Sequence, residues 1–569
     1  GQTTGGVSGK KFNQFGGWDL GVRPQLEVLK EINHHGVSIV ELERKNGKWT
    51  YKVNSPYNRR VNGQSPMRIS GPAADLADIR SFMVTRFDTT GATSRGTLNN
   101  CGHGKTPWGT YLGCEENWAA YFFMPKGSTA PDAKTVASRQ RYGVARAPLA
   151  AGATTGGTQG WHLPDADAND DRFARWDVSV RGATPDLDFR NEPNTFGYNV
   201  EIDPLSSGMS VKRVAMGRFA HEAAVCGLPQ PGKPLAFYMG CDSQNEYIYK
   251  FVTAANWDPA DIGRGIAAGD KYLDEGKLYT AKFNDDGSGE WIELTINDPR
   301  ISGYTTYKFD NQADVFINAR HAARAVGATP MDRPEWGAVN PKNGEVYFAL
   351  TNNASALRNL STVDAANPRA FNDLDENGAI VKDSLGREIG GNPNGHIIRF
   401  KEGAQTASTA TSFKWDIFLF GAEEATNPAT NLSGLTAAND FSSPDGLWFS
   451  QATGICWIQT DDGAFTDKSN CMLLAAIPGT VGDGEKITVN NVLNGATGTQ
   501  DTFIGATLGE AQLRRFLVGP VGCEVTGITE TPDGKTLFVN IQHPGEGTGA
   551  LGTAAEFNPQ SRWPANTGY

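Results

Sequence analysis

The chain has 569 residues, of which 39% are hydrophobic, 10% are aromatic and 67 are glycine; this composition is that of a folded globular protein and excludes a disordered or collagen-like chain. With 63 acidic and 52 basic residues its net charge is −11, so we expect no nucleic-acid partner. Apolar runs such as 472–477 are far shorter than the roughly 18 residues that a membrane-spanning helix needs, so we expect no membrane segment.

The first residues, beginning with Gly1, contain no charged region followed by an apolar region. Such a chain is either a cytoplasmic form or a mature form whose export signal has been removed. The aromatic content and the excess of glycine favour short strands joined by tight turns, and thus an all-β fold.

Segments with the character of β-strands recur along the chain, each next to a glycine-containing turn. In chain order they lie at 108–112, 196–204, 246–251, 335–348, 395–400, 443–450, 454–460 and 524–539. Within 335–348 and 524–539, a strand, a turn with proline and glycine, and a returning strand predict a β-hairpin. At 443–450 a Pro-Asp-Gly turn is predicted ahead of an aromatic strand.

The strand clusters are separated by several tens of residues, and each cluster carries its own hairpin. This arrangement favours a β-propeller with long insertions, with a pair of stacked β-sandwiches as the alternative. Stretches rich in Gly, Ala, Asp and Pro near 125–195, 255–330 and 355–395 are predicted to be loop insertions. None of them resembles a linker between domains, so residues 1–569 are predicted to form a single domain.

Acidic residues fall just before several of the predicted strands. Glu222, Glu335 and Glu524 each precede a strand by a few residues, and Asp445 occupies a related place. In a propeller the innermost strands line a central channel, so these carboxylates would converge at one mouth of it. Because converging carboxylates repel one another, a cluster of cations is expected to hold them together. The alternative is that they are unconnected turn and cap residues.

Two further segments place candidate ligands at strand ends. Cys114, Glu115 and Glu116 follow a strand-like segment, and Asp242 ends another one. In an extended chain Cys114 and Glu116 share a face while Glu115 points away. Carboxylates alone favour calcium, magnesium or manganese, whereas a thiolate brings in a softer metal such as iron or zinc. The alternatives are a buried cysteine beside solvated acids, and an Asx turn at Asp242.

Two partial motifs are set aside. Residues 99–106 end like a phosphate-binding loop but lack its first glycine, and a proline and a strand follow where a helix is needed. Residues 373–378 copy the first half of a calcium-binding loop, but Ser384 stands at the twelfth position in place of glutamate. We therefore expect an Asx-rich turn there in preference to a calcium loop.

Four motifs, in sequence order, carry a family resemblance. They are Thr106-Pro-Trp-Gly-Thr-Tyr-Leu-Gly-Cys-Glu-Glu-Asn, Gly217-Arg-Phe-Ala-His-Glu, Arg333-Pro-Glu-Trp-Gly and Ser443-Pro-Asp-Gly. With them the chain resembles the PhoX-type calcium-dependent alkaline phosphatases of bacteria over nearly its whole length. The resemblance implies a six-bladed β-propeller, export in folded form by the twin-arginine route to the periplasm or beyond, and hydrolysis of phosphate esters at a mixed iron and calcium cluster.

The resemblance also implies roles for particular residues. Cys114 would be the thiolate ligand of a ferric ion (Fe3+), and Glu222 and Glu335 would be carboxylates of the cluster. Further ligands, mostly of Ca2+, would be Glu115, Glu116, Asp242, Asp445 and Glu524. Arg333 would face the substrate phosphate, and Lys105 would add a cation that reaches a phosphate oxygen.

The chemistry expected of such a cluster is the hydrolysis of phosphomonoesters, and of some diesters, with release of inorganic phosphate. A metal-bound oxygen would attack phosphorus in line while Arg333 stabilises the charge on the equatorial oxygens. The partners would be small-molecule phosphate esters, and the protein would be a monomer. The alternatives are a non-catalytic, calcium-braced propeller that binds glycans or proteins, and a calcium-only, phytase-like hydrolase.

Overall fold

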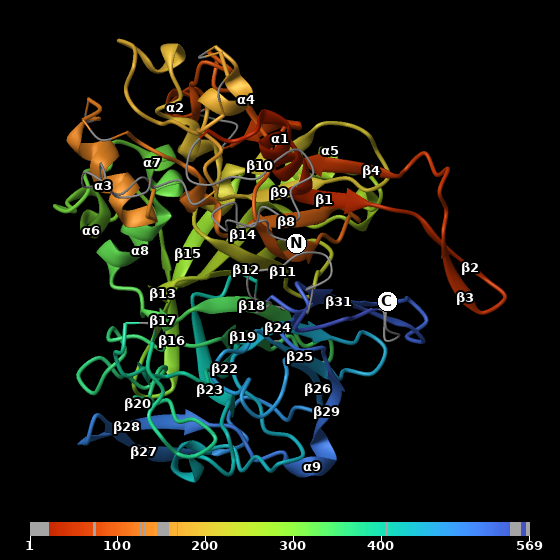
Figure 1. Cartoon of the computed structure of the whole chain (residues 1–569), viewed down its shortest axis with the longest axis vertical. Coiled ribbons are helices and arrows are strands. Elements are labelled where there is room, and N and C mark those ends of the chain that lie inside the picture. The colour runs from red at the N-terminus through yellow and green to blue at the C-terminus, as the bar shows by residue number, and fades with distance from the viewer. Residues whose placement is uncertain are drawn as a thin grey trace.

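The computed structural model describes residues 22–71, 76–125, 127–129, 131–144, 159–164, 166–167, 169–383, 385–403, 408–546 and 559–564. The first residues, parts of the predicted insertion at 125–195 and Ser384 lie outside these ranges. Strands dominate the described residues, so the fold is mostly β, as predicted (Figure 1). None of the helices in these ranges is both long and apolar enough to cross a membrane.

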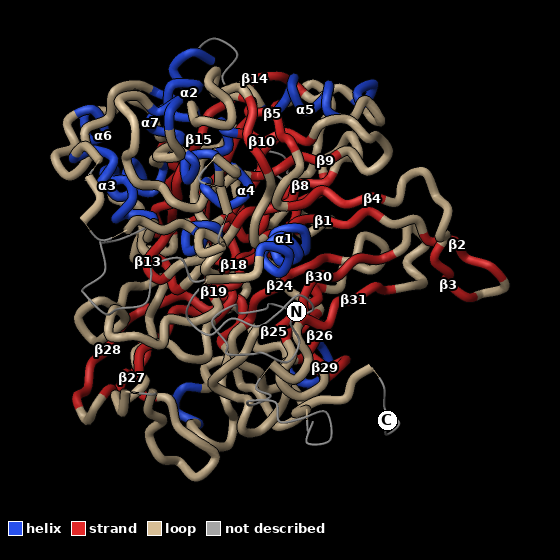
Figure 2. The backbone as a smooth tube through the Cα atoms, turned by 45° about the horizontal axis from the view of Figure 1, so that its top comes forward, coloured by secondary structure: helices blue, strands red, loops and turns tan. Residues whose placement is uncertain are grey.

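The first part of the chain forms a six-stranded sheet in the order β6-β5-β10-β9-β8-β7. Its strands are β5 (Pro66–Ser70), β6 (Thr93–Arg95), β7 (Asn100–Lys105), β8 (Tyr111–Glu115), β9 (Asn199–Ile202) and β10 (Ser210–Arg213). Before it in sequence come two antiparallel pairs, β1 (Gly36–Ile39) with β4 (Arg59–Asn62) and β2 (Leu42–Lys45) with β3 (Lys48–Tyr51). The β2–β3 hairpin projects from the body of the molecule (Figure 2).

The middle of the chain forms an eleven-stranded sheet whose two edge strands contact each other. Its order is β11 (His221–Cys226), β12 (Pro234–Cys241), β14 (Ile248–Asn256), β15 (Gly276–Phe283), β16 (Ser288–Glu293), β23 (Ser412–Phe420), β22 (His396–Lys401), β19 (Val346–Leu350) and β18 (Pro334–Val339). The hairpin of β27 (Glu485–Leu493) and β28 (Ala496–Ile504) joins through β23. The sheet is therefore nearly closed.

The last part of the chain adds a four-stranded sheet and a two-stranded one. The first has β24 (Pro444–Phe449), β25 (Cys456–Thr460), β26 (Met472–Ala476) and β29 (Leu513–Val518); the second has β30 (Glu524–Glu530) and β31 (Leu537–Gln542). Two short pairs complete the strands: β13 (Gln244–Glu246) with β17 (Met331–Asp332), and β20 (Phe371–Asn372) with β21 (Gly390–Gly391). The hairpins predicted within 335–348 and 524–539 are confirmed.

The helices are short and lie mainly beyond one end of the strands (Figure 1). They are α1 (Gln25–His34), α2 (Leu76–Met83), α3 (Ala133–Tyr142), α4 (Asp171–Ala174), α5 (Ile266–Leu273), α6 (Pro299–Ser302), α7 (Gln312–Ile317), α8 (Ala319–Val326) and α9 (Gly509–Gln512). Helices α5 to α8 come from the predicted loop insertion at 255–330. That segment is only partly an insertion, because β15 and β16 extend the large sheet. The segment 355–395 is mostly loop, as expected.

Five strands from four sheets lie side by side in the middle of the molecule. Strand β7 contacts β11, β11 contacts β18, β18 contacts β24, and β24 contacts β30. Each is the first strand of an antiparallel hairpin, with β8, β12, β19, β25 or β31 as its partner. We call these five the inner strands. Large hydrophobic clusters pack against their faces, so their positions are set by the core.

Candidate active site

Four of the inner strands carry the same irregularity near their N-terminal ends. The pairing register shifts between Asn100 and His103 in β7, His221 and Ala224 in β11, Pro334 and Gly337 in β18, and Pro444 and Leu447 in β24. Such bulges re-aim side chains and are common beside active sites. The second residue of each strand lies in the irregular stretch, and these residues, Cys101, Glu222, Glu335 and Asp445, all line one pocket. We call it the acidic pocket.

The bulge also corrects one expectation about 443–450. The Pro-Asp-Gly sequence was predicted to form a turn ahead of a strand, but residues 444–446 already belong to β24. The local kink that proline and glycine produce is a bulge inside the strand. As a result Asp445 is directed into the acidic pocket from within the strand.

The partner strands of the hairpins supply further side chains to the acidic pocket. Glu116 directly follows β8, Asp242 follows β12, Asp461 follows β25 and His543 follows β31. All four line the pocket, together with Glu524, the first residue of β30. Four of the five hairpins thus contribute from the start of one strand and from just past the end of the other, whereas in the described lining the β18–β19 hairpin contributes only around the start of β18. The pocket is built by repeating one local geometry.

Backbone strain is concentrated around the same pocket. Asn99, Arg333, Ser443 and His543 have positive φ angles of 43°, 57°, 48° and 33°. For residues other than glycine this region is sparsely populated and costs of order 1–3 kcal/mol each. The first three directly precede β7, β18 and β24. In three of the four bulged strands a strained residue therefore leads the chain into the bulge, and such strain is typical of functional sites.

The acidic pocket has a volume of about 260 Å³ and a mostly polar lining. Its lining residues are Asn99, Asn100, Cys101, Glu116, Asn117, Glu222, Asp242, Arg333, Glu335, Asp445, Asp461, Glu524, Gln542 and His543. Three groups have ligand atoms within 4.8 Å of one another: Cys101, Glu116 and Glu222; Glu222, Asp242 and Glu335; and Asp445, Asp461 and Glu524. Because Glu222 belongs to two groups, the first two are continuous.

The carboxylates of the pocket destabilise one another's charged forms. Burial, followed by repulsion from Asp242, raises the pKa of Glu222 to about 8. Burial and Glu524 raise the pKa of Asp461 to about 7. The pKa values of Glu116, Glu335 and Asp445 are raised well above the ordinary range, again by burial first and by neighbouring carboxylates second. Acids held in this way at neutral pH require either protons or cations.

One oxygen of Glu222 shows where a cation would fit. Trp336 Nε1 donates to Glu222 Oε1 at 2.8 Å and orients the carboxylate. Within the described residues, the buried Oε2 has no hydrogen-bond partner. A buried carboxylate oxygen without a partner is costly. Since Glu222 groups with Cys101 and Glu116 and also with Asp242 and Glu335, the donor set suits a metal.

Arg333 places a positive charge at the edge of the acidic groups. Its Nε and Nη2 donate to Asp242 Oδ1 and Oδ2, each at 2.9 Å, and Nη2 also lies 2.9 Å from Glu335 Oε1. Burial opposes charge on Asp242, but Arg333 outweighs it and the pKa of Asp242 is lowered. The Arg333 side chain is 25% exposed, and in the described part of the chain Nη1 has no acceptor. The guanidinium can therefore still bind an anion.

Three sequence-predicted residues are not brought to the acidic pocket. Cys114 is buried in the hydrophobic core, with its Sγ 3.2 Å from Asn199 Oδ1. Glu115 pairs with Lys212 Nζ at 2.9 Å on the opposite face of β8. Lys105 is exposed at the far end of β7, four residues past Cys101, which is roughly 13 Å along a strand. None of the three belongs to the described lining of the acidic pocket.

Three ionisable residues of the pocket were missed, and the sequence carried a signal for two of them. Cys101 lies in 99–106, set aside above as an incomplete phosphate loop, yet it stands one residue into a strand as Glu222 and Glu335 do. Asp461 follows the strand at 454–460 just as Asp242 follows its own strand. His543, whose Nε2 lies 2.6 Å from Glu524 Oε1, has no comparable signal.

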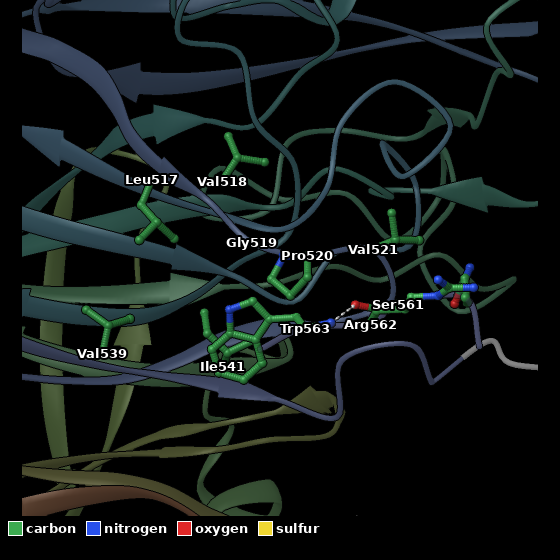
Figure 3. A pocket seen from close by; sticks show the side chains of 11 residues that line it. Leu517, Val518, Gly519, Pro520, Val521, Val539, Ile541, Ser561, Arg562 and Trp563 are labelled. Carbon is green, nitrogen blue, oxygen red and sulfur yellow. Dashed lines mark hydrogen bonds between the residues drawn. The ribbon is translucent and has the colours of Figure 1, made fainter. Parts of the chain in front are cut away.

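A larger cavity of about 730 Å³ lies elsewhere, against β29, β31 and residues 560–563 (Figure 3). Its lining is mostly apolar, with Leu517, Val539, Ile541 and Trp563 among the side chains that face it. No acidic residue belongs to its described lining. Arg562 is the charged residue of this described lining, so the cavity offers neither a general base nor carboxylate ligands for a metal.

Comparison with known proteins gives a family and similar solved structures. A family model described as alkaline phosphatase PhoX matches residues 19–545. Pseudomonas fluorescens PhoX, solved in complex with vanadate as a transition state analogue, is 36% identical with a TM-score of 0.69, over 95% of this chain and 80% of that chain. An iodide structure of a Trichoderma reesei enzyme of carbohydrate-active family AA12 is 11% identical, with a TM-score of 0.18, over 61% of this chain and 88% of that one. A search of curated proteins finds no match.

Proposed function

Because the chain belongs to the alkaline phosphatase PhoX family and is a phosphatase, we propose that its acidic pocket hydrolyses phosphomonoesters, and some diesters, with a resident centre of iron and calcium ions. The observation that carries the proposal is the group of Cys101, Glu116 and Glu222, with ligand atoms within 4.8 Å and one buried carboxylate oxygen left without a partner in the described residues. The vanadate bound by the Pseudomonas fluorescens protein supports phosphoryl chemistry.

The donor types divide the pocket between the two metals. The group that contains Cys101 offers a thiolate beside two carboxylates, a set that suits iron. The group of Asp445, Asp461 and Glu524 offers oxygen alone, as calcium prefers. The group of Glu222, Asp242 and Glu335 connects them through Glu222. We thus assign the thiolate role that family resemblance gave to Cys114 to Cys101 instead.

When bound, the metals would neutralise the carboxylates, attract the phosphate dianion and supply an activated nucleophile. Arg333 would bind the phosphate through Nη1 while its other nitrogens remain on Asp242 and Glu335. Holding the guanidinium in this way fixes its plane before the substrate arrives, so little orientation entropy is lost on binding. Its charge would then stabilise the oxygens that gain charge in the transition state.

The neutral and polar residues of the pocket complete the assignment. Asn99, Asn100 and Asn117 offer amide groups at its lining, which suit a phosphate or a leaving-group oxygen. Gln542 Nε2 donates to Glu524 Oε2 at 2.6 Å and His543 Nε2 lies 2.6 Å from Glu524 Oε1, so both residues would hold the Glu524 carboxylate in place.

We also make proposals about the number of blades, the oligomeric state and the location of the protein. Each of the five inner strands contacts the next one along the chain, which supports a β-propeller. We propose that it has six blades, as the family resemblance implies. We also propose a monomer exported to the periplasm or beyond. The non-catalytic binder is set aside because the chain is a phosphatase, and the calcium-only hydrolase is disfavoured because Cys101 stands among the ligands.

The first test is elemental analysis of the purified protein, paired with hydrolysis of a chromogenic phosphomonoester before and after calcium chelation. We expect iron and calcium in stoichiometric amounts, with activity lost on chelation and restored by calcium. Calcium without iron would favour the calcium-only hydrolase. Turnover that survives removal of all metal would overturn the proposed centre.

A pair of cysteine variants tests the iron assignment directly. Cys101→Ser should lose iron and any thiolate-to-iron absorption band, because the thiolate is removed from the group with Glu116 and Glu222. Cys114→Ser is the matched control and should keep both, since its thiol contacts Asn199 in the core. The reverse result would return the ligand role to Cys114.

A further inference from the structure

Arg320 is a buried arginine that stands outside the acidic pocket but contacts residues beside it. It is the second residue of α8, one of the helices in the segment 255–330, and it is 6% exposed. It does not belong to the described lining of the acidic pocket. Its guanidinium contacts the segment between β12 and β14, where Asp242 lies. Helix α8 therefore reaches the surroundings of the pocket from outside it.

The guanidinium of Arg320 binds both chain neighbours of Asp242. Its Nε and Nη2 donate to Cys241 Sγ at 3.2 and 3.1 Å, and Nη2 also donates to Ser243 Oγ at 2.9 Å. Ser243 Oγ in turn donates to the backbone O of Asp242 at 2.6 Å. The backbone N–H of Asp242 donates to Ala220 O at 3.0 Å. The backbone of Asp242 is thus fixed on both sides, while its carboxylate lines the acidic pocket.

The same segment also leads to Arg333. Strand β13 pairs with β17, and the register sets Gln244 opposite Asp332, the residue before Arg333. At the end of β13 the carboxylate of Glu246 lies 3.7 Å from Arg320 Nε. Arg320 therefore supports both partners of the ion pair that Arg333 forms in the acidic pocket.

Arg320 is itself held firmly, so it can act as a rigid support. Arg141 Nη2 donates to Glu246 Oε2 at 2.8 Å and to the backbone O of Arg320 at 3.3 Å. The guanidinium carbon of Arg320 lies 5.2 Å from the centre of the Tyr142 ring. Arg141 and Tyr142 both belong to α3, so α3 fixes the side chain that α8 presents. A planar guanidinium held in this way is already oriented for its hydrogen bonds.

We propose that Arg320 is a positioning residue for the phosphatase reaction, which fixes Asp242 and, through Asp242, orients the guanidinium of Arg333 for phosphate. Arg333 Nε and Nη2 donate to the two carboxylate oxygens of Asp242, so this carboxylate sets the plane of the guanidinium. A displacement of about 1 Å at such a position can cost about a hundredfold in rate. The inference rests on the proposed function, because it concerns the same site.

The test is a double-mutant cycle with inorganic phosphate as the ligand. Calorimetry measures phosphate binding to the full-length, metal-loaded protein, and steady-state kinetics with a chromogenic phosphomonoester give KM and kcat. Arg320→Gln should weaken phosphate binding and raise KM by about tenfold or more, the loss typical of residues that orient a ligand-binding side chain. In an Asp242→Asn background, Arg320→Gln should cause no further loss, because its effect passes through Asp242.

Arg175→Gln is the matched control. Arg175 is 1% exposed and donates from Nε to Glu192 Oε1 at 2.7 Å, but it lies outside the described lining of the acidic pocket. Its replacement should lower Tm and leave phosphate affinity within about twofold. If Arg320 only stabilised the fold, Arg320→Gln would behave like this control, or its full effect would recur in the Asp242→Asn background. Either result would overturn the proposal.

A milder variant keeps the test decisive if Arg320→Gln fails to fold. Ser243→Ala removes the hydroxyl that links Arg320 to the backbone O of Asp242 and should weaken phosphate binding by about threefold. Ser243→Thr retains a hydroxyl and should bind phosphate as the wild type does. Equal phosphate affinity in the two Ser243 variants would show that this link does not position Asp242.

The metal content of the wild type reports separately on the proposed function. A wild-type protein without bound iron and calcium would overturn the proposed centre, and phosphate binding would still test the role of Arg320 through the same cycle. A wild-type protein that holds both metals and binds phosphate, but whose cycle is additive, would overturn the role of Arg320 alone.

Discussion

Glu115 and Glu116 are neighbours in the chain, but protein groups compensate the charge of Glu115, whereas Glu116 lies beside other acids. Glu115 is fully buried, and its carboxylate accepts from Lys212 Nζ at 2.9 Å and from the backbone N–H groups of Gly197 and Tyr198 at 2.8 and 3.1 Å. Glu116 is also buried but meets Glu222 and Asp242. A buried carboxylate whose charge is balanced by protein donors stabilises the fold. A buried carboxylate that lies among other acids needs a bound cation or a proton, which is typical of functional sites.

The same contrast holds between larger regions. Beside β9 and β10, the buried Arg213 pairs with Glu201, Asp270 and Asp274, the last two at 2.7 Å. In the acidic pocket, by contrast, the described lining offers two cationic partners: Arg333 pairs with Asp242 and Glu335, and His543 pairs with Glu524. The excess of acids in the pocket therefore marks where the protein relies on bound cations.

The largest expected effect comes from the single arginine of the pocket. Arg333→Ala should lower kcat/KM by about two to four orders of magnitude, since charge stabilisation in a phosphoryl-transfer transition state is lost. Iron and calcium content should be retained, because Arg333 is not a ligand. Steady-state kinetics and elemental analysis check both parts. Arg172→Ala, at an exposed ion pair, is the control, and near-normal turnover of Arg333→Ala would contradict the role.

The second-largest expected effect is a loss of stability when Glu115, the compensated carboxylate, loses its partner Lys212. Lys212→Met leaves Glu115 buried without its cation and should lower the free energy of unfolding by about 3–5 kcal/mol. Denaturant unfolding of the metal-loaded protein measures it. Lys277→Met, at an exposed pair with Glu293, should cost less than about 1 kcal/mol. Equal losses in the two variants would mean that the Lys212 pair contributes no more than a surface pair.

The third effect is a pH dependence that belongs to the metal-free protein. The pKa values of Glu222 and Asp461 are raised in the folded state from 4.5 and 3.8 to about 8 and about 7. The folded state thus binds protons more tightly, and the stabilisation present below about pH 4 is lost as pH rises to about 8.

Urea unfolding of the chelated protein should therefore show stability falling by about 2 kcal/mol or more between pH 5 and pH 8. The metal-loaded protein should lack this decline, because bound cations keep the carboxylates charged. Stability of the chelated protein that rises over this range would show that the acids are already compensated.

The smallest expected effect is that of replacing Cys114, which lies in the core and not in the acidic pocket. Cys114→Ser should lower the free energy of unfolding by roughly 1 kcal/mol, through a buried hydroxyl in place of a thiol. Its kcat/KM should change less than about twofold, because Cys114 lies outside the acidic pocket. Thermal unfolding and steady-state kinetics provide the check. A large loss of activity with stability intact would place Cys114 closer to the chemistry.

Much of the acidic pocket could be predicted because its pattern is local. Glu222, Glu335 and Asp445 each stand at the beginning of an aromatic or apolar strand, and Glu116 and Asp242 each end one. The hairpins at 335–348 and 524–539 were likewise readable from their turns. These features need only the alternation of a strand and the chemistry of a turn.

The errors arose where pairing between distant strands decides the outcome. Cys101 and Cys114 lie on paired strands, and the bulge between Asn100 and His103 directs the first into the pocket. A bulge depends on the partner's register, which the local sequence does not reveal. Strands β15 and β16 were also taken for loop, although they pair with each other across a short turn and β15 pairs with the nearby β14; only β23, the other partner of β16, lies far away in the chain.

The acidic pocket takes its lining from positions 99 to 543, and this span has a consequence for biosynthesis. Asp461, Glu524 and His543 are among the last parts of the chain to be made, whereas Cys101 and Glu116 are among the first. Contacts over such separations form late, after large loops have closed. A nascent chain would therefore carry an incomplete chelating site until β30–β31 docks, so binding of metal by the full set of ligands would require the finished fold.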